Sequence, residues 1–441
     1  MTIIFTYATM GCMNQEELLE ARDRLEAFLQ PLLLLLGRAE RRRHGAMYLQ
    51  GLLLEGGRKT ASGIAVRYRG DVQALQQFVS QSPWDFLAIR RELAVQMVTA
   101  ASPGGAWIID DTGFPKKGDR SVAVARQYSG TLGKIGNCQV AVSLNYATAD
   151  GCFPVNFELY LPETWVADAG RRQKTGIPGD ITFRTKWQIG LDLLDQAKAW
   201  GLPDSVVIAD AAYGSITEFR RALEKRELHY VVGINPELTV WTEPVTASSL
   251  PYAGRGRPRT WRRALPPPVK VGELAQRLPE EAWREITWRQ GTKGPLTSRF
   301  AALRVQPAPE HWKGKVTEPV CWLLLEWPSG ETGPAKYWFA NLPDHTDLRG
   351  LVYWAKMRWW VEQNYQQLKT ELGLDHFEGR SWLGWHHHVT LTMMAFDFLV
   401  LEGCRVKKNY WVDPPASPTR TPASDPDAPG LLPLLSTNHH L

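Results

Sequence analysis

The sequence is poor in cysteine and has no long hydrophobic run. Its 441 residues include 5 cysteines, which are scattered and never spaced as a C-x-x-C pair. A disulfide scaffold and a thiolate zinc site are therefore disfavoured, and a reducing cytoplasm fits. The longest apolar run, residues 32–36, is far too short to cross a bilayer, and the first dozen residues lack the basic start of a secretion signal. We therefore expect a cytoplasmic protein with no membrane partner.

A strong excess of one charge is also missing. Lys and Arg number 51 against 46 Asp and Glu, a net charge of +5, which by itself does not argue for a polyanionic partner. The hydrophobic content of 44% suits a soluble globular protein, and the length predicts about three domains. What the chain does have is tryptophan, with 19 residues that cluster in basic segments.

The periodicity of apolar residues divides the first half of the chain in two. Helical spacing predicts a helical N-terminal DNA-binding region over residues 14–100. The basic positions within residues 38–59 fit a solvated helix face and a DNA-facing surface equally well. Residues 101–235 predict three strands followed by helix–strand–helix–strand, which is the pattern of a mixed α/β sheet.

The second half begins with an interruption. Residues 236–335 are rich in Pro, Arg and Trp and predict a β-rich domain inserted into the first fold. Strand and helix patterns resume over residues 336–411, where residues 347–372 predict one long amphipathic helix. Residues 412–441 are rich in Pro, Ser and Asp, and we expect them to be disordered.

Three acidic residues stand out by their context. Asp111 and Asp210 each end a predicted strand, and Glu362 lies within the long predicted helix. Ligand sites gather at such strand ends, although a single strand-end Asp is more often a cap or turn residue. Carboxylates about 4 Å apart repel by roughly 4 kcal/mol at an effective dielectric of 20, so a cluster of them needs a cation. Oxygen ligands without His or Cys favour Mg²⁺ or Mn²⁺, and two such ions suit in-line attack at a phosphodiester.

Four residues of the long predicted helix share one face. Arg358, Glu362, Tyr365 and Lys369 recur at helical spacing. This stripe fits an ordinary salt-bridged surface, and it equally fits a metal-binding carboxylate between two phosphate-binding cations.

These residues also carry a resemblance to a known family. The spacing Arg358-x3-Glu362-x6-Lys369 resembles the Tyr-Arg-Glu-Lys signature of the DDE transposases of bacterial insertion sequences. The segments IDDTGFPKKG, RQYSGTLGKIGNCQV and VIADAAYG are similar to the regions around the first two catalytic aspartates of that group. GLDHFEGRSWLGWHHH is similar to the stretch after the signature. The resemblance is greatest to the insertion-sequence family numbered seven-oh-one, a DDE superfamily endonuclease family, and covers roughly residues 38–401.

The resemblance implies a fold and an activity. The fold would be an α/β RNase H-like mixed sheet, with a β-rich insertion domain between the second Asp and the Glu. Asp111, Asp210 and Glu362 would bind two Mg²⁺ or Mn²⁺ ions. The protein would cleave the terminal inverted repeats of the element and join the 3′-hydroxyl to target DNA. It would act as a homodimer in a prokaryotic cytoplasm, associated with the nucleoid when bound to DNA.

The assignment of the triad involves two choices and one departure. Asp111 is preferred to Asp110 because it directly precedes Thr112, as the first catalytic acid of the family does, and because adjacent strand residues face opposite ways. Glu371 is the alternative third acid, but it lacks the Arg and Lys register. The signature Tyr falls on Ala355, which affects DNA contact rather than catalysis.

Basic and aromatic residues supply candidates for DNA binding. The segment RGRPR at residues 255–259 resembles an AT-hook core, with a flexible basic loop as the alternative. WREITWRQGTKGPLTSRF interleaves aromatics and cations, which suits stacking on an unpaired base, although core packing is the likelier role for a single Trp. The DNA-binding candidates are Arg358, Lys369, Tyr365, Lys116, Lys117, Trp288, Arg289, Arg255, Arg257 and Arg259.

Three consecutive histidines, residues 386–388, do not predict a zinc site. Successive residues of a helix point about 100° apart, so these side chains cannot share one ion with good geometry. Two other functions stay open at this stage. One is a domesticated DNA-binding protein that no longer cuts, and the other is a general RNase H-like nuclease or resolvase.

Overall fold

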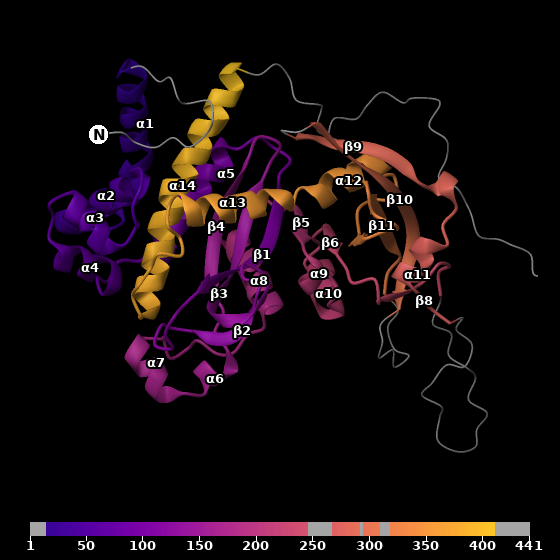
Figure 1. Ribbon diagram of the computed structural model, residues 1–441, viewed down its shortest axis with the longest axis horizontal. Helices are drawn as coiled ribbons and strands as arrows, with labels where there is room; N and C mark the ends of the chain where they lie inside the picture. The colour runs from indigo at the N-terminus through magenta and orange to yellow at the C-terminus, as the bar shows by residue number, and fades with distance from the viewer. Residues whose placement is uncertain (1–14, 246–266, 292–293, 309–317, 411–441) are drawn as a thin grey trace, which may run out of the picture.

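The computed structural model describes residues 15–245, 267–291, 294–308 and 318–410. The molecule is elongated, with a group of helices at one end and long strands at the other (Figure 1). A sheet to which 12 strands of the described residues belong runs between these ends. No helix in these ranges is both long and apolar enough to span a membrane.

The central part of the sheet combines antiparallel and parallel strands. β1 (Ala106–Pro115) pairs antiparallel with β3 (Lys134–Ala147), which pairs antiparallel with β4 (Cys152–Leu159). On its other side β1 pairs parallel with β5 (Val206–Ala209), which pairs parallel with β6 (Tyr230–Gly233). The predicted mixed α/β sheet is confirmed. A further short strand, β2 (Ala125–Ser129), pairs with the beginning of β3.

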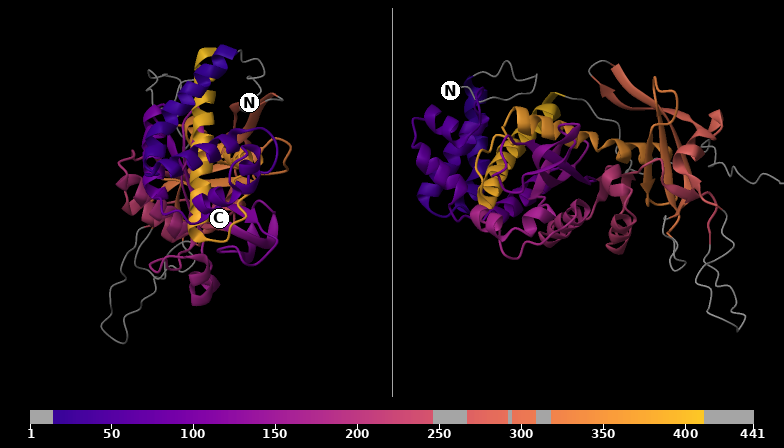
Figure 2. Two further views of the ribbon diagram at one scale, coloured as in Figure 1. Left: turned by 90° about the vertical axis from the view of Figure 1, so that its left-hand side faces the viewer. Right: turned by 60° about the horizontal axis from the view of Figure 1, so that its bottom comes forward.

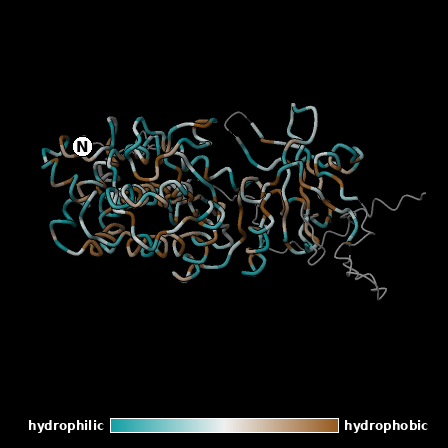
Figure 3. Tube along the Cα trace, turned by 90° about the horizontal axis from the view of Figure 1, so that it is seen from below, coloured by the Kyte–Doolittle hydropathy of each residue, from teal (hydrophilic) through white to brown (hydrophobic). Residues whose placement is uncertain are grey.

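Both faces of this sheet are buried, so β1 and β5 are apolar almost throughout. Ile108 and Ile208 belong to one apolar cluster, whereas Ile109 and Val207 belong to the other. The apolar stretches accordingly run along the inner strands, and the hydrophilic stretches lie in outer turns (Figure 3). The alternation fixes the side on which each following residue of β1 emerges.

The helices between the strands begin where local capping dictates. α8 (Lys186–Ala199) starts with a capping box formed by Thr185 and Gln188, and it packs against β1, β3 and β4. The connection from β5 to β6 contains α9 (Ala211–Gly214) and α10 (Thr217–Lys225). The connection before α8 contains two short helices, α6 (Glu163–Val166) and α7 (Ala169–Thr175).

The predicted long helix over residues 347–372 is two helices. α12 (Leu348–Lys356) ends before a tight turn, and α13 (Trp359–Thr370) begins just after it. At the turn the amide of Met357 donates to the carbonyl of Trp354, a three-residue spacing that tightens the backbone. The prediction of one continuous helix was wrong because the buried Met357 and the bonds of Arg358 outweigh the continuous amphipathic pattern.

Five helices of the described residues form the N-terminal end of the molecule and pack around the long α14 (Trp382–Tyr410) (Figure 2, left). They are α1 (Gln15–Leu34), α2 (Ala39–Leu53), α3 (Ala61–Arg67), α4 (Val72–Ser80) and α5 (Phe86–Ala100). α1 continues through Pro31, which lies inside the helix. The buried Leu29 and Leu32 on either side hold the helix together despite the lost backbone donor.

Residues 236–335, predicted as an inserted β-rich domain, are mainly β in their described parts. Their strands extend the central sheet, because β12 (Lys336–Ala340) pairs with both β6 and β11. The elements of this stretch are β7 (Thr239–Trp241), β8 (Val269–Lys270), α11 (Val271–Gln276), β9 (Arg284–Gly291), β10 (Gly294–Ala308) and β11 (Cys321–Pro328). The predicted disordered tail lies outside the described residues.

Candidate functional site

Acidic residues of β1 and β5 meet at the carboxyl end of their parallel pair. Ile109 lies beside Ala209 in the register, so the acids that follow in each strand are neighbours. Asp210 ends β5 and caps α9, where its side chain accepts a hydrogen bond of 2.9 Å from the amide of Ala212. This is the place at which α/β sheets gather their ligand sites.

Two glycines allow α9 to lie close enough to hold Asp210 there. A Cβ added to Gly214 would stand 2.1 Å from the carbonyl oxygen of Gly233. A Cβ on Gly233 would stand 3.0 Å from the amide nitrogen of Ala211. Only hydrogen at these positions lets the helix and β6 approach each other.

Arg358, at the start of α13, connects the acids of the two strands with Glu362. Its guanidinium donates to Asp110 at 2.8 Å and also to Glu362. Burial lowers the pKa of Arg358, but the charges of Asp110, Glu362 and Asp210 outweigh it and raise the pKa. Arg358 therefore bridges Asp110 of β1 and Glu362 of α13, whereas no hydrogen bond or ion pair of the described residues joins Asp111 to Glu362.

Burial disfavours the charged form of the acids in this cluster. Burial, against the opposing effect of Arg358 and with smaller contributions from the charges of Asp210 and Asp111, raises the pKa of Asp110 to about 7. The pKa of Asp210 is also raised, first by burial and then by the charge of Asp111. One arginine does not fully compensate several carboxylates in a buried setting.

Asp111 emerges on the opposite face of β1 from Asp110. It lies on the side of Ile109, towards α8, and its carboxylate accepts a hydrogen bond of 2.8 Å from the ammonium of Lys186. Sequence reasoning missed Lys186, whose only local signal is its place at the start of a capped helix. From the sequence, Asp111 is preferred to Asp110, yet Asp110 is the carboxylate that contacts Arg358.

The donors of this cluster fit a hard divalent cation by their chemistry. All are carboxylate oxygens, the ligands that Mg²⁺ and Mn²⁺ prefer. Within the residues that the structure describes, no three His, Cys, Asp or Glu side chains stand close enough together to hold a metal ion. Instead, Arg358 and Lys186 supply the positive charge beside the acids.

Two other members of the predicted helix stripe point towards the sheet. The ammonium of Lys369 donates to the carbonyl of Gly113 at 2.8 Å and to the hydroxyl of Thr131, and burial lowers its pKa to about 8. The hydroxyl of Tyr365 lies 2.6 Å from that of Ser143 in β3. Both side chains fasten α13 over β1 and β3.

The predicted DNA-binding residues beyond the helix lie in different environments. Lys116 donates to the carbonyl of Phe377 at 2.7 Å, whereas Lys117 is exposed. The guanidinium carbon of Arg289 lies 3.2 Å from the ring centre of Trp359, next to the start of α13. The ring of Trp288 is covered by the ammonium of Lys356 at 4.5 Å. Arg255, Arg257 and Arg259 lie outside the described residues.

The three consecutive histidines of α14 have separate partners. The ring of His386 stacks on Phe86, that of His387 stacks on Trp84, and His388 hydrogen-bonds to the hydroxyl of Tyr48 at 2.8 Å. The structure therefore gives them packing and hydrogen-bonding roles between α14 and the N-terminal helices.

The sequence is similar to known proteins. Residues 31–295 match the family described as DDE superfamily endonuclease. A probable transposase for insertion sequence element IS701, from Microchaete diplosiphon, is 34% identical to the chain over 165 residues. The match covers 37% of this chain and 40% of that protein, so it spans less than half of the length of the relative.

Proposed function

This chain belongs to the DDE superfamily endonuclease family, and on that premise we propose that it is a DNA transposase. It cleaves the ends of an insertion sequence and joins the 3′-hydroxyl to target DNA. The observation that carries the proposal is the convergence of Asp110, Asp210 and Glu362 on Arg358, with Asp111 adjacent.

The strand order supports an RNase H-like catalytic fold. β4, β3 and β1 are antiparallel neighbours, and β1, β5 and β6 are parallel neighbours. Acids within β1 and directly after β5, with a third acid on a helix packed over the sheet, are the arrangement that the family resemblance implies. The β-rich stretch 236–335 is proposed as the insertion domain that lies between the second and third acids.

We propose that Asp111, Asp210 and Glu362 bind the metal, as the resemblance implies, with Asp110, which shares Arg358 with Glu362, as the alternative first acid. Two Mg²⁺ or Mn²⁺ ions held there would lower the pKa of an attacking water or hydroxyl and stabilise the leaving 3′ oxygen. Asp110 holds Arg358 in place, and Arg358 in turn positions Glu362. One proposed ligand, Asp111, and the residue that holds Arg358, Asp110, thus occupy adjacent positions of one strand.

The cations around the acids suit a DNA backbone. Lys117 is exposed just beyond β1, and Arg289 lies beside Trp359 at the start of the catalytic helix. Such cations neutralise phosphates and give binding that weakens with salt. The proposed partners are the terminal inverted repeats and target DNA, held by a homodimer because two ends must be brought together.

Metal-dependent cleavage of a duplex with the terminal repeats tests the proposal. Asp111→Ala, Asp210→Ala and Glu362→Ala should each abolish Mg²⁺-dependent cutting, while end binding in EDTA persists. Glu371→Ala is the matched control, since it removes an acid of the same segment outside the cluster. Retained cutting in any triad variant would refute that assignment. Cutting that ignores the terminal repeats would identify a general nuclease, and binding without any cutting a domesticated protein.

A further inference from the structure

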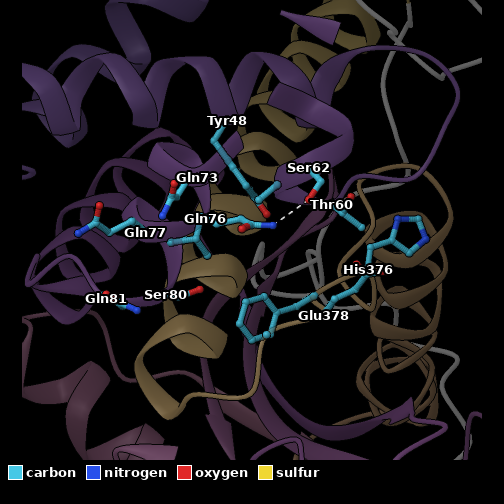
Figure 4. A pocket seen from close by; sticks show the side chains of 14 residues that line it. Tyr48, Thr60, Ser62, Gln73, Gln76, Gln77, Ser80, Gln81, His376 and Glu378 are labelled. Atoms are coloured by element: carbon cyan, nitrogen blue, oxygen red, sulfur yellow. Dashed lines mark hydrogen bonds between the residues drawn. The ribbon is translucent and has the colours of Figure 1, made fainter. Parts of the chain in front are cut away.

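A cleft of about 530 Å³ lies between the N-terminal helices and the loop that follows α13 (Figure 4). One wall is formed by α4 and the start of α3, and the other by residues 376–379. Its lining is dominated by uncharged amides and hydroxyls, among them Gln73, Gln76, Gln77, Gln81, Thr60 and Ser62. This composition differs from the charged cluster of the proposed active site.

The helix that lines the cleft belongs to a helix–turn–helix unit. α3 and α4 are joined by residues 68–71, pack against each other and both pack against α2. Asp71 caps α4 by accepting hydrogen bonds from the amides of Gln73 and Ala74. In units of this shape the second helix enters the major groove of DNA.

The surface of α4 is unusual for a solvent-facing helix. Its sequence, VQALQQFVS, contains no charged residue, and its exposed positions are Gln73, Gln76 and Gln77. The amide of Gln76 donates to the hydroxyl of Ser62 at 2.9 Å, which fixes the orientation of the side chain (Figure 4). An oriented amide can donate and accept at the same time, and this is how Gln recognises the major-groove edge of adenine.

Cations lie beside this amide surface rather than within it. Arg58, Arg67 and Arg69 flank or join the two helices, and all three are exposed. Arg58 is paired at 3.4 Å with Glu378, itself exposed, on the opposite wall. Arg58 at the rim and amides inside suit phosphate contact at the rim and base contact within.

The far wall of the cleft is fastened to the proposed active site. The ammonium of Lys116, just beyond β1, donates to the carbonyl of Phe377. The backbone amide of Lys59, at the start of α3, donates to the ring of His376 at 3.1 Å. Residues 376–379 also belong to the loop that follows α13, so a ligand in the cleft contacts the loop next to the helix that carries Glu362.

We propose that this cleft reads the base sequence of the DNA end on which the chain acts. One strand of a duplex enters between α4 and residues 376–379. Gln73, Gln76 and Gln77 then reach adenine-containing base pairs from the major groove, and Arg58 lies beside a phosphate. The inference deepens the proposed function, on which it rests, by locating the residues that select the substrate.

The test is selection from a pool of random 20-base-pair duplexes by the full-length protein in EDTA. The unaltered chain should enrich a motif. Gln73→Ala, Gln76→Ala and Gln77→Ala should each relax the preference at one or two base pairs by about tenfold. Binding to the unselected pool should stay unchanged, because phosphate contacts remain. Gln50→Ala is the control, since Gln50 is an exposed glutamine of α2 that does not line the cleft.

The outcomes separate this inference from the proposed function. If the alanine variants enrich the same motif as the unaltered chain, or if no motif is enriched, the inference is overturned. If they change the oligomeric state but not the motif, the cleft is a protein interface and the inference is also overturned. A third outcome is that the unaltered chain cuts no DNA with Mg²⁺ but the alanine variants still lose the motif. That result would support the reading of bases and contradict the transposase assignment.

Discussion

The guanidinium of Arg358 lies 2.8 Å from a carboxylate oxygen of Asp110, and the neighbouring Asp111 is 2.8 Å from Lys186 on the other face of β1. Adjacent acids therefore have different partners. The side chain of Asp110 is only 11% exposed, against 19% for Asp111. The more buried acid holds the arginine that contacts Glu362, and the more accessible one is better placed to meet a ligand.

This difference predicts different outcomes for two matched variants. Asp111→Asn should abolish Mg²⁺-dependent cleavage, because it removes a proposed metal ligand. Asp110→Asn should lower kcat by about tenfold and leave measurable cleavage, because the amide still accepts a hydrogen bond from Arg358 but no longer carries charge. Cleavage assays at saturating Mg²⁺ measure both. Full activity in Asp111→Asn together with none in Asp110→Asn would reverse the two roles.

Lys186 predicts an effect on metal affinity rather than on folding. Its ammonium competes with a cation for the carboxylate of Asp111, so Lys186→Gln should tighten Mn²⁺ binding by about two- to fivefold, the value of a partly exposed ion pair. Calorimetric titration of the DNA-free protein with Mn²⁺ measures this. Lys198→Gln, which removes an exposed lysine of the same helix, is the control. Weaker binding in Lys186→Gln would contradict the competition.

The strands of the central sheet could be predicted from the sequence because their residues alternate or form short buried runs. The place of Asp210 just after β5 followed from those strands, as did the shared face of Arg358 and Glu362. The predicted strand end at Asp111 was wrong, because pairing with β3 continues β1 to Pro115. Such patterns are local, and the packing of a two-sided sheet preserves them. The mixed order of antiparallel and parallel strands agrees with the resemblance that the signature suggested.

What escaped prediction depends on contacts between distant segments. Lys186 and Asp111 are 75 positions apart, and no local pattern signals their ion pair. The break before α13 reflects burial of Met357 and the bonds of Arg358 across to β1. The glutamine surface of α4 was legible in the sequence, but it became informative only when the loop after α13 was seen to form the opposite wall.

Gly214 predicts a defect that begins in packing and reaches the site. A methyl group there would meet the backbone of β6, which cannot move aside, so Gly214→Ala should lower the free energy of unfolding by about 1–3 kcal/mol. It should also lower cleavage, because α9 carries Asp210 at its start. Thermal unfolding with a parallel cleavage assay measures both. Gly179→Ala is the control because a Cβ there has open space, and equal stability of the two variants would contradict this account.

The buried histidines of α14 predict a loss of stability in acid. Burial lowers the pKa of His387 and of His388 to about 4, below the value of about 6.5 in an unfolded chain. The folded state therefore favours neutral rings, and the stability gained from this preference is fully present above pH 6.5. That advantage falls as the pH drops from 6.5 towards 4, because the unfolded state binds more protons over this range. The groups that face His388 are Tyr48, Lys116 and His376, and both of the latter oppose a charged ring when they are protonated.

The preference for a neutral ring contributes about 3 kcal/mol per ring to the free energy of unfolding above pH 6.5, which is large against the usual stability of a domain. His387→Gln should be less stable than the unaltered chain at pH 7.5, because it loses the single hydrogen bond that a neutral ring donates, to the carbonyl of Val79 or to that of Trp84. It should nevertheless show a shallower fall in melting temperature between pH 6.5 and 4. His345→Gln, at an exposed position, should retain the full slope. Parallel slopes for all three proteins would mean that the ring of His387 is already protonated in the folded state, with its charge balanced by those carbonyls.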